Sequence, residues 1–310
     1  MRHFLLIQTL LIISCTNIKH HPDEIFQFQK QKVARSKNGV VTTAHPLATQ
    51  AAVEILTAGG NAMDAAVAAA FTLSVVEPSM SGIGGRAQII IYNPADGVHG
   101  IDATTQAPSY YKFDDTLGVE YGYQTIAVPG VVKGLTDALQ NYGTLPLAQV
   151  MNPAIAYANN GYKLLPGEAL RQRSVNEFLK EFAGTRQYYL DKDSLTYDAG
   201  KLIVQQDLGK VLKAISDNGP EVFYQGWIAE AMVKDVSDNG GFLTLESLKN
   251  YRTEKSHIVN GSYRGYSIKA LWLPAYGAIT IEALQILEQL QVNMNEHRER
   301  GLAIYHAVES

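Results

Sequence analysis

The chain has 310 residues, of which 46% are hydrophobic and 18% charged, with a formal net charge of −4 and one cysteine. This composition indicates a globular protein and excludes the disordered, collagen-like and coiled-coil classes. One cysteine excludes an internal disulfide framework and a zinc or iron–sulfur site built from cysteines. Since the charges form no basic block, we expect no nucleic-acid partner, and we expect no metal or other cofactor.

The N-terminal segment has the pattern of an export signal. An apolar stretch at residues 4–13 follows Arg2 and is too short to span a bilayer. It leads into Ile-Ile-Ser-Cys, ending at Cys15, which resembles the lipobox of bacterial lipoproteins. We therefore expect a signal peptide at residues 1–14, lipidation of Cys15, and a protein held by a lipid anchor on the periplasmic side or cell surface. The alternative is an ordinary secretory signal without lipidation.

Residues 15–38 form the next segment, which is polar and predicts a flexible tether behind the lipidated cysteine. The pair His20-His21 lies in this tether without a nearby third ligand, so we interpret it as linker and not as a metal site. One continuous domain is expected over residues 39–310.

In chain order, the domain begins with alternating elements. A strand is predicted at 40–44, then a helix at 48–58 ending at two glycines, and a second helix at 62–76 that starts at Asn61. Two strands at 87–92 and 98–103 flank a turn-forming segment and predict a hairpin. Helices are then expected at 130–141, 147–159, 166–183, 207–217, 226–238 and 245–250, followed by a strand at 266–271 and a helix at 280–290.

The most conspicuous short motif is Ser-Gly-Ile-Gly-Gly at residues 81–85. Its glycines fit a dinucleotide-binding pattern, but that pattern requires a strand before the glycines and a helix after them, which is the reverse of the order predicted here. We interpret the glycines as a tight backbone passage where side chains would clash. Asp191-Lys192-Asp193 begins like a calcium loop but lacks the required glycine and glutamate, which favours a surface loop. Spacing alone therefore gives no complete catalytic set.

Several different short motifs follow one another along the chain: Gly39–Gln50, Gly59–Ala66, Val76–Ser79, Ser81–Gly85, Ala127–Val131, Asn218–Tyr224, Gly226–Ala229, Leu243–Tyr251 and Tyr263–Tyr266. In this order they resemble the large-subunit half of the γ-glutamyltranspeptidases, from about residue 39 to the end. The resemblance implies an α+β fold, the αββα sandwich of the N-terminal-nucleophile hydrolases, which this large-subunit part would form incompletely.

The resemblance also implies a chemistry. In the family, a precursor cuts itself before a threonine that opens the small subunit; this threonine attacks a γ-glutamyl amide, and the acyl-enzyme passes to water or an acceptor amine. The family's nucleophile stands in a Thr-Thr-His sequence that this chain lacks, and residues 42–45, Thr-Thr-Ala-His, lie in the first strand far from any processing site. We therefore expect no catalytic residue here, a missing small subunit that carries the threonine, and a γ-glutamyl substrate such as glutathione.

Substrate binding is where the sequence departs from the family. An arginine that grips the substrate α-carboxylate normally stands where this chain has Thr104, whereas Arg86 is gained on the other arm of the predicted hairpin. If Tyr92 pairs with Val98, Arg86 faces Thr104 and could replace the lost arginine. A competing register with a two-residue turn at 96–97 would turn the two residues apart, and Arg86 could also be a solvated loop residue. Tyr276 and Ala278 also replace smaller family residues, so the loop there must differ.

Two functions remain open at this stage. The first is the large-subunit portion of an exported γ-glutamyl hydrolase or transferase, or of a relative that acts on another amide, inactive as this chain alone. The second is a non-catalytic lipoprotein that keeps the sandwich half as a binding or assembly module.

Overall fold

The structure, a computed structural model, describes residues 33–111, 121–290 and 296–309. The chain divides into two units, residues up to Val40 and residues from Val41 onward. The expected signal peptide, the lipidation site Cys15 and the pair His20-His21 lie outside the described residues. Among those that are described, no helix is long and apolar enough to cross a membrane.

The second unit begins with two helices, α1 (Pro46–Thr57) and α2 (Ala62–Val76), both predicted. Helix α2 starts with a reciprocal cap in which Asn61 accepts from the backbone N–H of Asp64 and Asp64 accepts from that of Asn61. The predicted strand at 40–44 is wrong. That segment makes no ladder with any described strand, and a strand requires a paired neighbour.

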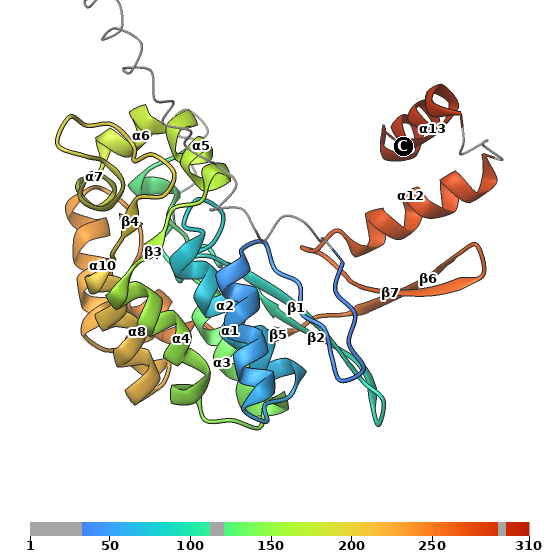
Figure 1. Cartoon of the computed structure of the whole chain (residues 1–310), viewed down its shortest axis with the longest axis horizontal. Coiled ribbons are helices and arrows are strands. Elements are labelled where there is room, and N and C mark those ends of the chain that lie inside the picture. The colour runs from blue at the N-terminus through green and yellow to red at the C-terminus, as the bar shows by residue number, and fades with distance from the viewer. Residues whose placement is uncertain (1–32, 112–120, 291–295, 310) are drawn as a thin grey trace, which may run out of the picture. The chain divides into compact units, whose positions relative to one another are not determined.

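Helix α2 forms the centre of the core. Six of its 15 residues are alanine, and buried Val67, Phe71 and Val75 supply its larger side chains. Small side chains allow close packing, and α1, α3 (Val131–Tyr142) and α4 (Leu147–Asn160) all contact α2. Figure 1 shows these helices beside the β1–β2 hairpin.

The hairpin consists of β1 (Ala87–Asn93) and β2 (Gly97–Ala103), with β5 (Glu254–Lys255) on the far side of β2. Its register pairs Tyr92 with Val98, so the register that would let Arg86 face Thr104 is confirmed and the competing one is wrong. Helix α3 lies against this hairpin so closely that a Cβ added at Gly134 would come within 2.3 Å of the Ala103 Cβ. The sheet and α3 therefore form one closely packed layer pair.

The middle of the chain is mainly helical, as predicted, with one correction. The single helix expected at 166–183 is three helices, because the backbone at Val175 and Phe182 leaves helical geometry, with φ −108° and ψ 134° at Phe182. The elements of this region are η3 (Tyr123–Thr125), β3 (Tyr162–Lys163), α5 (Pro166–Ser174), α6 (Asn176–Glu181), α7 (Ala183–Tyr189), β4 (Leu202–Ile203), α8 (Gln206–Asn218), α9 (Glu221–Tyr224), α10 (Trp227–Asp238) and α11 (Leu245–Asn250).

A second hairpin follows, formed by β6 (Ile258–Tyr263) and β7 (Tyr266–Leu271). The sequence predicted β7 but not β6. Arg264 and Gly265, the two turn residues, both have positive φ (49° and 81°), as a two-residue turn between right-twisted strands requires. Helix α12 (Gly277–Gln289) packs on this hairpin and α13 (His297–Glu309) packs on α12.

Candidate functional site

The first hairpin brings three polar side chains together at its open end. Gln88 in β1 pairs directly with Asp102 in β2, and Thr104 follows β2. Residues two apart on a strand share a face, so Asp102 and Thr104 point to the side on which Gln88 lies. The expected substrate residue Thr104 therefore belongs to a cluster with two residues that sequence reasoning did not single out.

Gln88 is the centre of this cluster. Its Nε2 donates to the Asp102 carboxylate at 2.5 Å and to the Thr104 hydroxyl at 2.6 Å. The Thr104 N–H donates to the same Asp102 oxygen at 2.8 Å. The remaining amide oxygen, Gln88 Oε1, is buried and has no hydrogen-bond partner among the described residues. The cluster thus holds one carboxylate and one unused buried acceptor.

Arg86, the other expected substrate residue, lies one position before β1 and is exposed. In the described parts of the chain it makes no hydrogen bond or ion pair, and the Thr104 hydroxyl is held by Gln88. The backbone register required for a relocated arginine is present, whereas contact of Arg86 with a substrate carboxylate stays a prediction.

Two stacked tyrosines fix the backbone behind the cluster. The Tyr251 hydroxyl donates to the Thr104 carbonyl at 2.8 Å, and the Tyr224 hydroxyl donates to the Pro129 carbonyl at 2.8 Å. Their rings are stacked at 5.6 Å with an interplanar angle of 8°. Burial raises the pKa of both hydroxyls, so they remain neutral donors at physiological pH.

The glycine segment at residues 81–85 precedes β1. Helix α2 comes before it and a strand after it, which confirms that it is not a dinucleotide loop. Gly85 has a structural role, since its carbonyl accepts from the N–H groups of Gly130 and Val131 where α3 begins. The expected steric reason fails at Gly82 and Gly84, because a Cβ at either position would meet no described atom within 4 Å.

A buried ionic cluster lies at the other end of this segment. The Glu168 carboxylate in α5 is 1% exposed and accepts from the N–H and hydroxyl of Ser79 at 3.1 and 2.6 Å. Arg171 pairs with both Glu168 and Glu77 at 2.8 Å. Burial raises the pKa of Glu77, and the Arg171 charge opposes this shift. Only the i, i+3 spacing of Glu168 and Arg171 was visible in the sequence, and it gives no sign of partners some 90 residues earlier.

Thr43 and His45 make hydrogen bonds at the N-terminus of α1. This structural role supports the interpretation that residues 42–45 are not the family's nucleophile motif. The Thr43 hydroxyl donates to the His45 carbonyl at 2.7 Å, and His45 Nδ1 accepts from the Leu47 N–H at 3.1 Å. Burial lowers the pKa of His45 to about 4; the Glu168 charge opposes this shift to a smaller extent, and the Arg171 charge adds to it. His45 is therefore a neutral helix cap at physiological pH.

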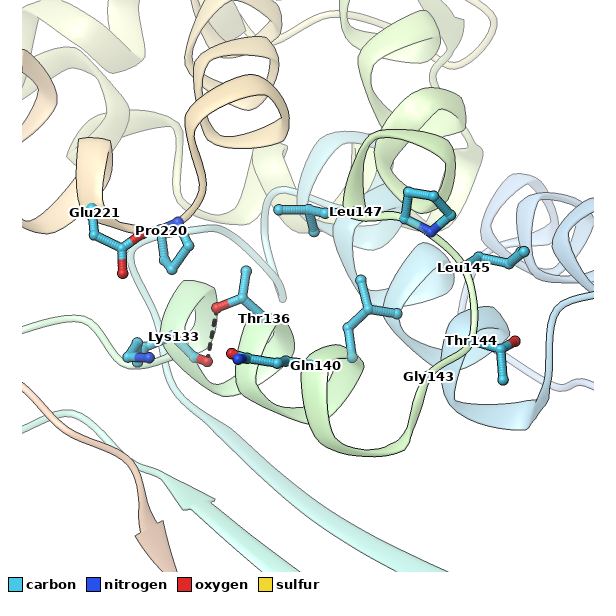
Figure 2. A pocket seen from close by; sticks show the side chains of 11 residues that line it. Lys133, Thr136, Gln140, Gly143, Thr144, Leu145, Leu147, Pro220 and Glu221 are labelled. Atoms are coloured by element: carbon cyan, nitrogen blue, oxygen red, sulfur yellow. Dashed lines mark hydrogen bonds between the residues drawn. The ribbon is translucent and has the colours of Figure 1, made fainter.

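A pocket of about 520 Å³ lies on a different part of the domain. Figure 2 shows Lys133, Thr136 and Gln140 along one side of it on α3, with Leu145 and Pro220 on other walls. Lys133 is ion-paired with Asp137, and the Thr136 hydroxyl bonds back to its own helix. The pocket shares no residue with the hairpin cluster and presents no set of groups for a reaction.

Within residues 33–111, 121–290 and 296–309, no group of three or more histidine, cysteine or acidic side chains could hold an ion. The calcium-like segment is a turn in which Asp191 accepts from the N–H groups of Asp193 and Leu195. Its carboxylate is thus used to close a surface loop, as expected.

Comparison with known families decides the assignment. The family model for gamma-glutamyltranspeptidase matches residues 48–310. The chain belongs to the gamma-glutamyltranspeptidase family. Among solved structures, the gamma-glutamyltranspeptidase of Helicobacter pylori superposes with a TM-score of 0.83 at 33% identity, covering 89% of this chain and 83% of that one. This similarity confirms the predicted α+β fold of the N-terminal-nucleophile hydrolases.

Relatives in the gamma-glutamyltranspeptidase family carry two kinds of name. The Acylase ACY 1 proenzyme of Pseudomonas sp. (strain V22) is 36% identical over 84% of this chain and 49% of its own length. The Glutathione hydrolase proenzyme of Bacillus subtilis (strain 168) is 32% identical over 89% of this chain and 49% of its own length. A cephalosporin acylase from Bacillus halodurans superposes with a TM-score of 0.78 at 28% identity, over 90% of this chain and 56% of that one. The chain thus spans about half the length of the curated relatives that it matches.

Proposed function

We propose that residues 39–310 form the large-subunit portion of an exported, lipid-anchored enzyme that hydrolyses or transfers the acyl group of an amide. The nucleophile would be a threonine in a small subunit outside these 310 residues. The observation that carries this proposal is the family match over residues 48–310, with relatives about twice as long that are named hydrolases and acylases.

The proposed reaction divides the work between the two subunits. The threonine oxygen forms a bond to the amide carbon, the carbon–nitrogen bond breaks, and the amine leaves with a proton delivered by the threonine's own amino group. Water or an acceptor amine then takes the acyl group and restores the threonine. In this proposal, the role of residues 39–310 is to bind the end of the acyl group that is remote from the amide, through the hairpin cluster of Gln88, Asp102 and Thr104.

For this hairpin cluster, a γ-glutamyl substrate such as glutathione requires a cation for its α-carboxylate. Arg86 is the candidate, since the hairpin register brings its backbone opposite residue 104. The loss of a buried charge-assisted pair costs about 2 to 5 kcal/mol. If no other cation replaced the family's arginine, the affinity for the carboxylate would therefore be about 30-fold lower or more.

A second candidate is an acylase whose acyl group carries no carboxylate at this position. One observation favours it. Asp102 places a carboxylate in the cluster beside Gln88, where it repels a second anion, whereas the buried acceptor Gln88 Oε1 suits an amine or amide N–H and fits either candidate. The acylase relatives in the family support the same reading.

Two anilide substrates that differ by one group separate the candidates. γ-Glutamyl anilide carries the α-carboxylate, and 4-aminobutyryl anilide lacks it but is otherwise the same. The complete protein, produced with its remaining sequence, should cleave at least one of them. A kcat/KM ratio of about 30 or more in favour of the γ-glutamyl compound, abolished by Arg86→Gln, supports the relocated arginine; a ratio near unity supports the acylase.

A substitution with a matched control completes the test. Thr104→Arg should raise the ratio towards the γ-glutamyl anilide, whereas Thr105→Arg places the same charge at a residue that takes no part in the hairpin cluster and should change the ratio much less. If the complete protein cleaves neither anilide nor any other acyl amide tested, the enzyme proposal fails and the non-catalytic lipoprotein remains. The sequence downstream of codon 310 provides an early check, since an open frame with Thr-Thr-His favours the enzyme.

A further inference from the structure

The turn between α2 and the glycine segment is built from Glu77, Pro78 and Ser79. Glu77 caps α2, and Pro78 cannot continue a helix. The Glu77 carbonyl accepts from the N–H groups of Met80 and Ser81 at 3.1 and 3.0 Å, which closes the turn on itself. The direction in which the chain leaves α2 is therefore set at this turn.

Glu168 of α5 holds the far side of the turn. Its Oε1 accepts from the Ser79 N–H, the Ser79 hydroxyl and the Gln172 amide, while its Oε2 accepts from Arg171. Five donor groups surround this carboxylate, so it is fully hydrogen-bonded although it is only 1% exposed. Hydrogen bonds to a charged acceptor are stronger than those between neutral groups. The contact joins two segments 89 residues apart.

Arg171 makes a second connection between the same helix and the same turn. Its Nη2 lies 2.8 Å from Glu77 and 2.8 Å from Glu168, so it neutralises one of two acids that face each other. The turn is thus held at Glu77 through Arg171 and at Ser79 through Glu168. We call these four residues the α5 clamp.

The segment that follows depends on restraints at its ends. Between Ser79 and Gly85, the described residues place no atom within 4 Å of a Cβ at Gly82 or Gly84, and glycine backbone is intrinsically free. At the far end, the Gly85 carbonyl accepts from Gly130 and Val131 at 2.9 and 3.1 Å. The α5 clamp and the start of α3 hold the two ends of this segment, Ile83 packs against the hydrophobic core between them, and β1 begins two residues after Gly85.

We propose that Glu168 and Arg171 are positioning residues, which through the α5 clamp hold the glycine segment and set how β1 presents Arg86 and Gln88 to the acyl group. The link to the acyl group rests on the proposed function. The link from clamp to glycine segment does not, and it can be measured separately.

Hydrogen exchange measures the first link in the complete protein. In Glu168→Gln, the hydrogen-bonded amides at the start of the segment, those of Ser79, Met80 and Ser81, should exchange about tenfold faster or more, because a neutral amide replaces a charged acceptor and presents donors to donors. Arg173→Gln is the matched control. It removes an arginine of the same helix whose partner, Asp198, is 90% exposed, so exchange at 79–85 should not change.

Steady-state kinetics measure the second link. Glu168→Gln should raise KM for the cleaved anilide several-fold with a smaller change in kcat, because β1 contacts the acyl end of the substrate and not the nucleophile. The double variant with Ser79→Ala should be no worse than Glu168→Gln alone, since both remove the same contact. If Glu168→Gln does not fold, Ser79→Ala alone carries both measurements.

The outcomes are distinct. Faster exchange confined to 79–85 together with a raised KM supports the proposal. Exchange at 79–85 like that of the Arg173→Gln control overturns it, and so does faster exchange with KM unchanged. A complete protein without activity refutes the proposed function and the presentation of substrate, while the exchange result still decides whether the clamp holds the glycine segment.

Discussion

Asp64 is the residue whose replacement tests the packing of the core most directly. It is completely buried in α2 and is the one charged residue of that helix. Its two oxygens accept from the backbone N–H groups of Asn61, Thr144 and Leu145 and from the Thr144 hydroxyl. The carboxylate therefore fastens the start of α2 to the loop between α3 and α4, 80 residues away.

Asp64→Asn keeps the shape and removes the charge. One of the two oxygens becomes an amide NH₂, so at least two of the groups that donate to the carboxylate then face another donor, whichever way the amide lies. Bonds to charged acceptors are worth about 1.5 to 3 kcal/mol each, and part of this is recovered by rotation of the Thr144 hydroxyl. We expect a loss of about 3 kcal/mol, which lowers the urea midpoint by about 1 M.

The pH dependence gives an independent check. Burial alone would raise the pKa of Asp64, but the Thr144 hydroxyl and the backbone N–H groups of Asn61 and Leu145 outweigh it and lower the pKa. A depressed pKa in the folded state gives stability that is present above the unfolded pKa, about 3.9, and is lost as the pH falls through the folded value. The difference between wild type and Asp64→Asn should be constant from about pH 5 to 7 and shrink below about pH 4.

Urea unfolding of the complete protein, followed by circular dichroism, measures both effects. Asp238→Asn is the control, because this exposed acid is paired only with Lys234 on the same helix and should cost less than about 0.5 kcal/mol. If Asp64→Asn costs no more than the control, or if its cost does not change with pH, the assignment of Asp64 as a buried ionised cap is refuted.

Three further predictions concern the whole chain. Purified residues 15–310 should not hydrolyse a γ-glutamyl anilide, because the proposed nucleophile and its amino group belong to the small subunit; turnover that survives further purification contradicts this. The same chain should be oligomeric or poorly soluble, since α13 exposes Leu302, Tyr305 and Val308, and a monomer with a sharp cooperative melt in light scattering and calorimetry would exclude it. Cys15→Ser should move the exported protein from the membrane fraction to the soluble fraction, and unchanged fractionation would rule out the lipid anchor.

Local sequence patterns predicted most of the longer helices and the first hairpin. Asn61 marked the start of α2, and turn residues between two strand-like segments predicted the first hairpin, whereas its register stayed open between two alternatives until the structure paired Tyr92 with Val98. The errors lie where distant partners decide. Residues 40–44 have strand composition but no described partner, and β6 is formed by pairing with β7 across the turn at Arg264 and Gly265.

The candidate site was predictable only in part. Thr104 and Arg86 were found because they depart from a family pattern. Gln88 departs from no family pattern, and its contact with Thr104 could be seen only once the register of the hairpin was known. The contact of Glu168 with Ser79, 89 residues earlier, has no signal in the sequence. A buried polar group is recognised by what it bonds, and its partners are known only once the chain is folded.

The contact between α3 and the first hairpin has a consequence for how selectivity can change. A Cβ at Gly130 would lie 2.2 Å from the Ala103 carbonyl oxygen and 2.2 Å from the Tyr251 hydroxyl, and one at Gly134 would collide with Ala103. The end of β2 at Ala103 is therefore held tightly against α3, and a side chain at position 130 or 134 would push the two apart. For the proposed enzyme, exchange of the side chains at 86, 88 and 104 is then a more accessible route to a new acyl preference than a change of the α3 contact, which makes these three positions the first choice for a small combinatorial library.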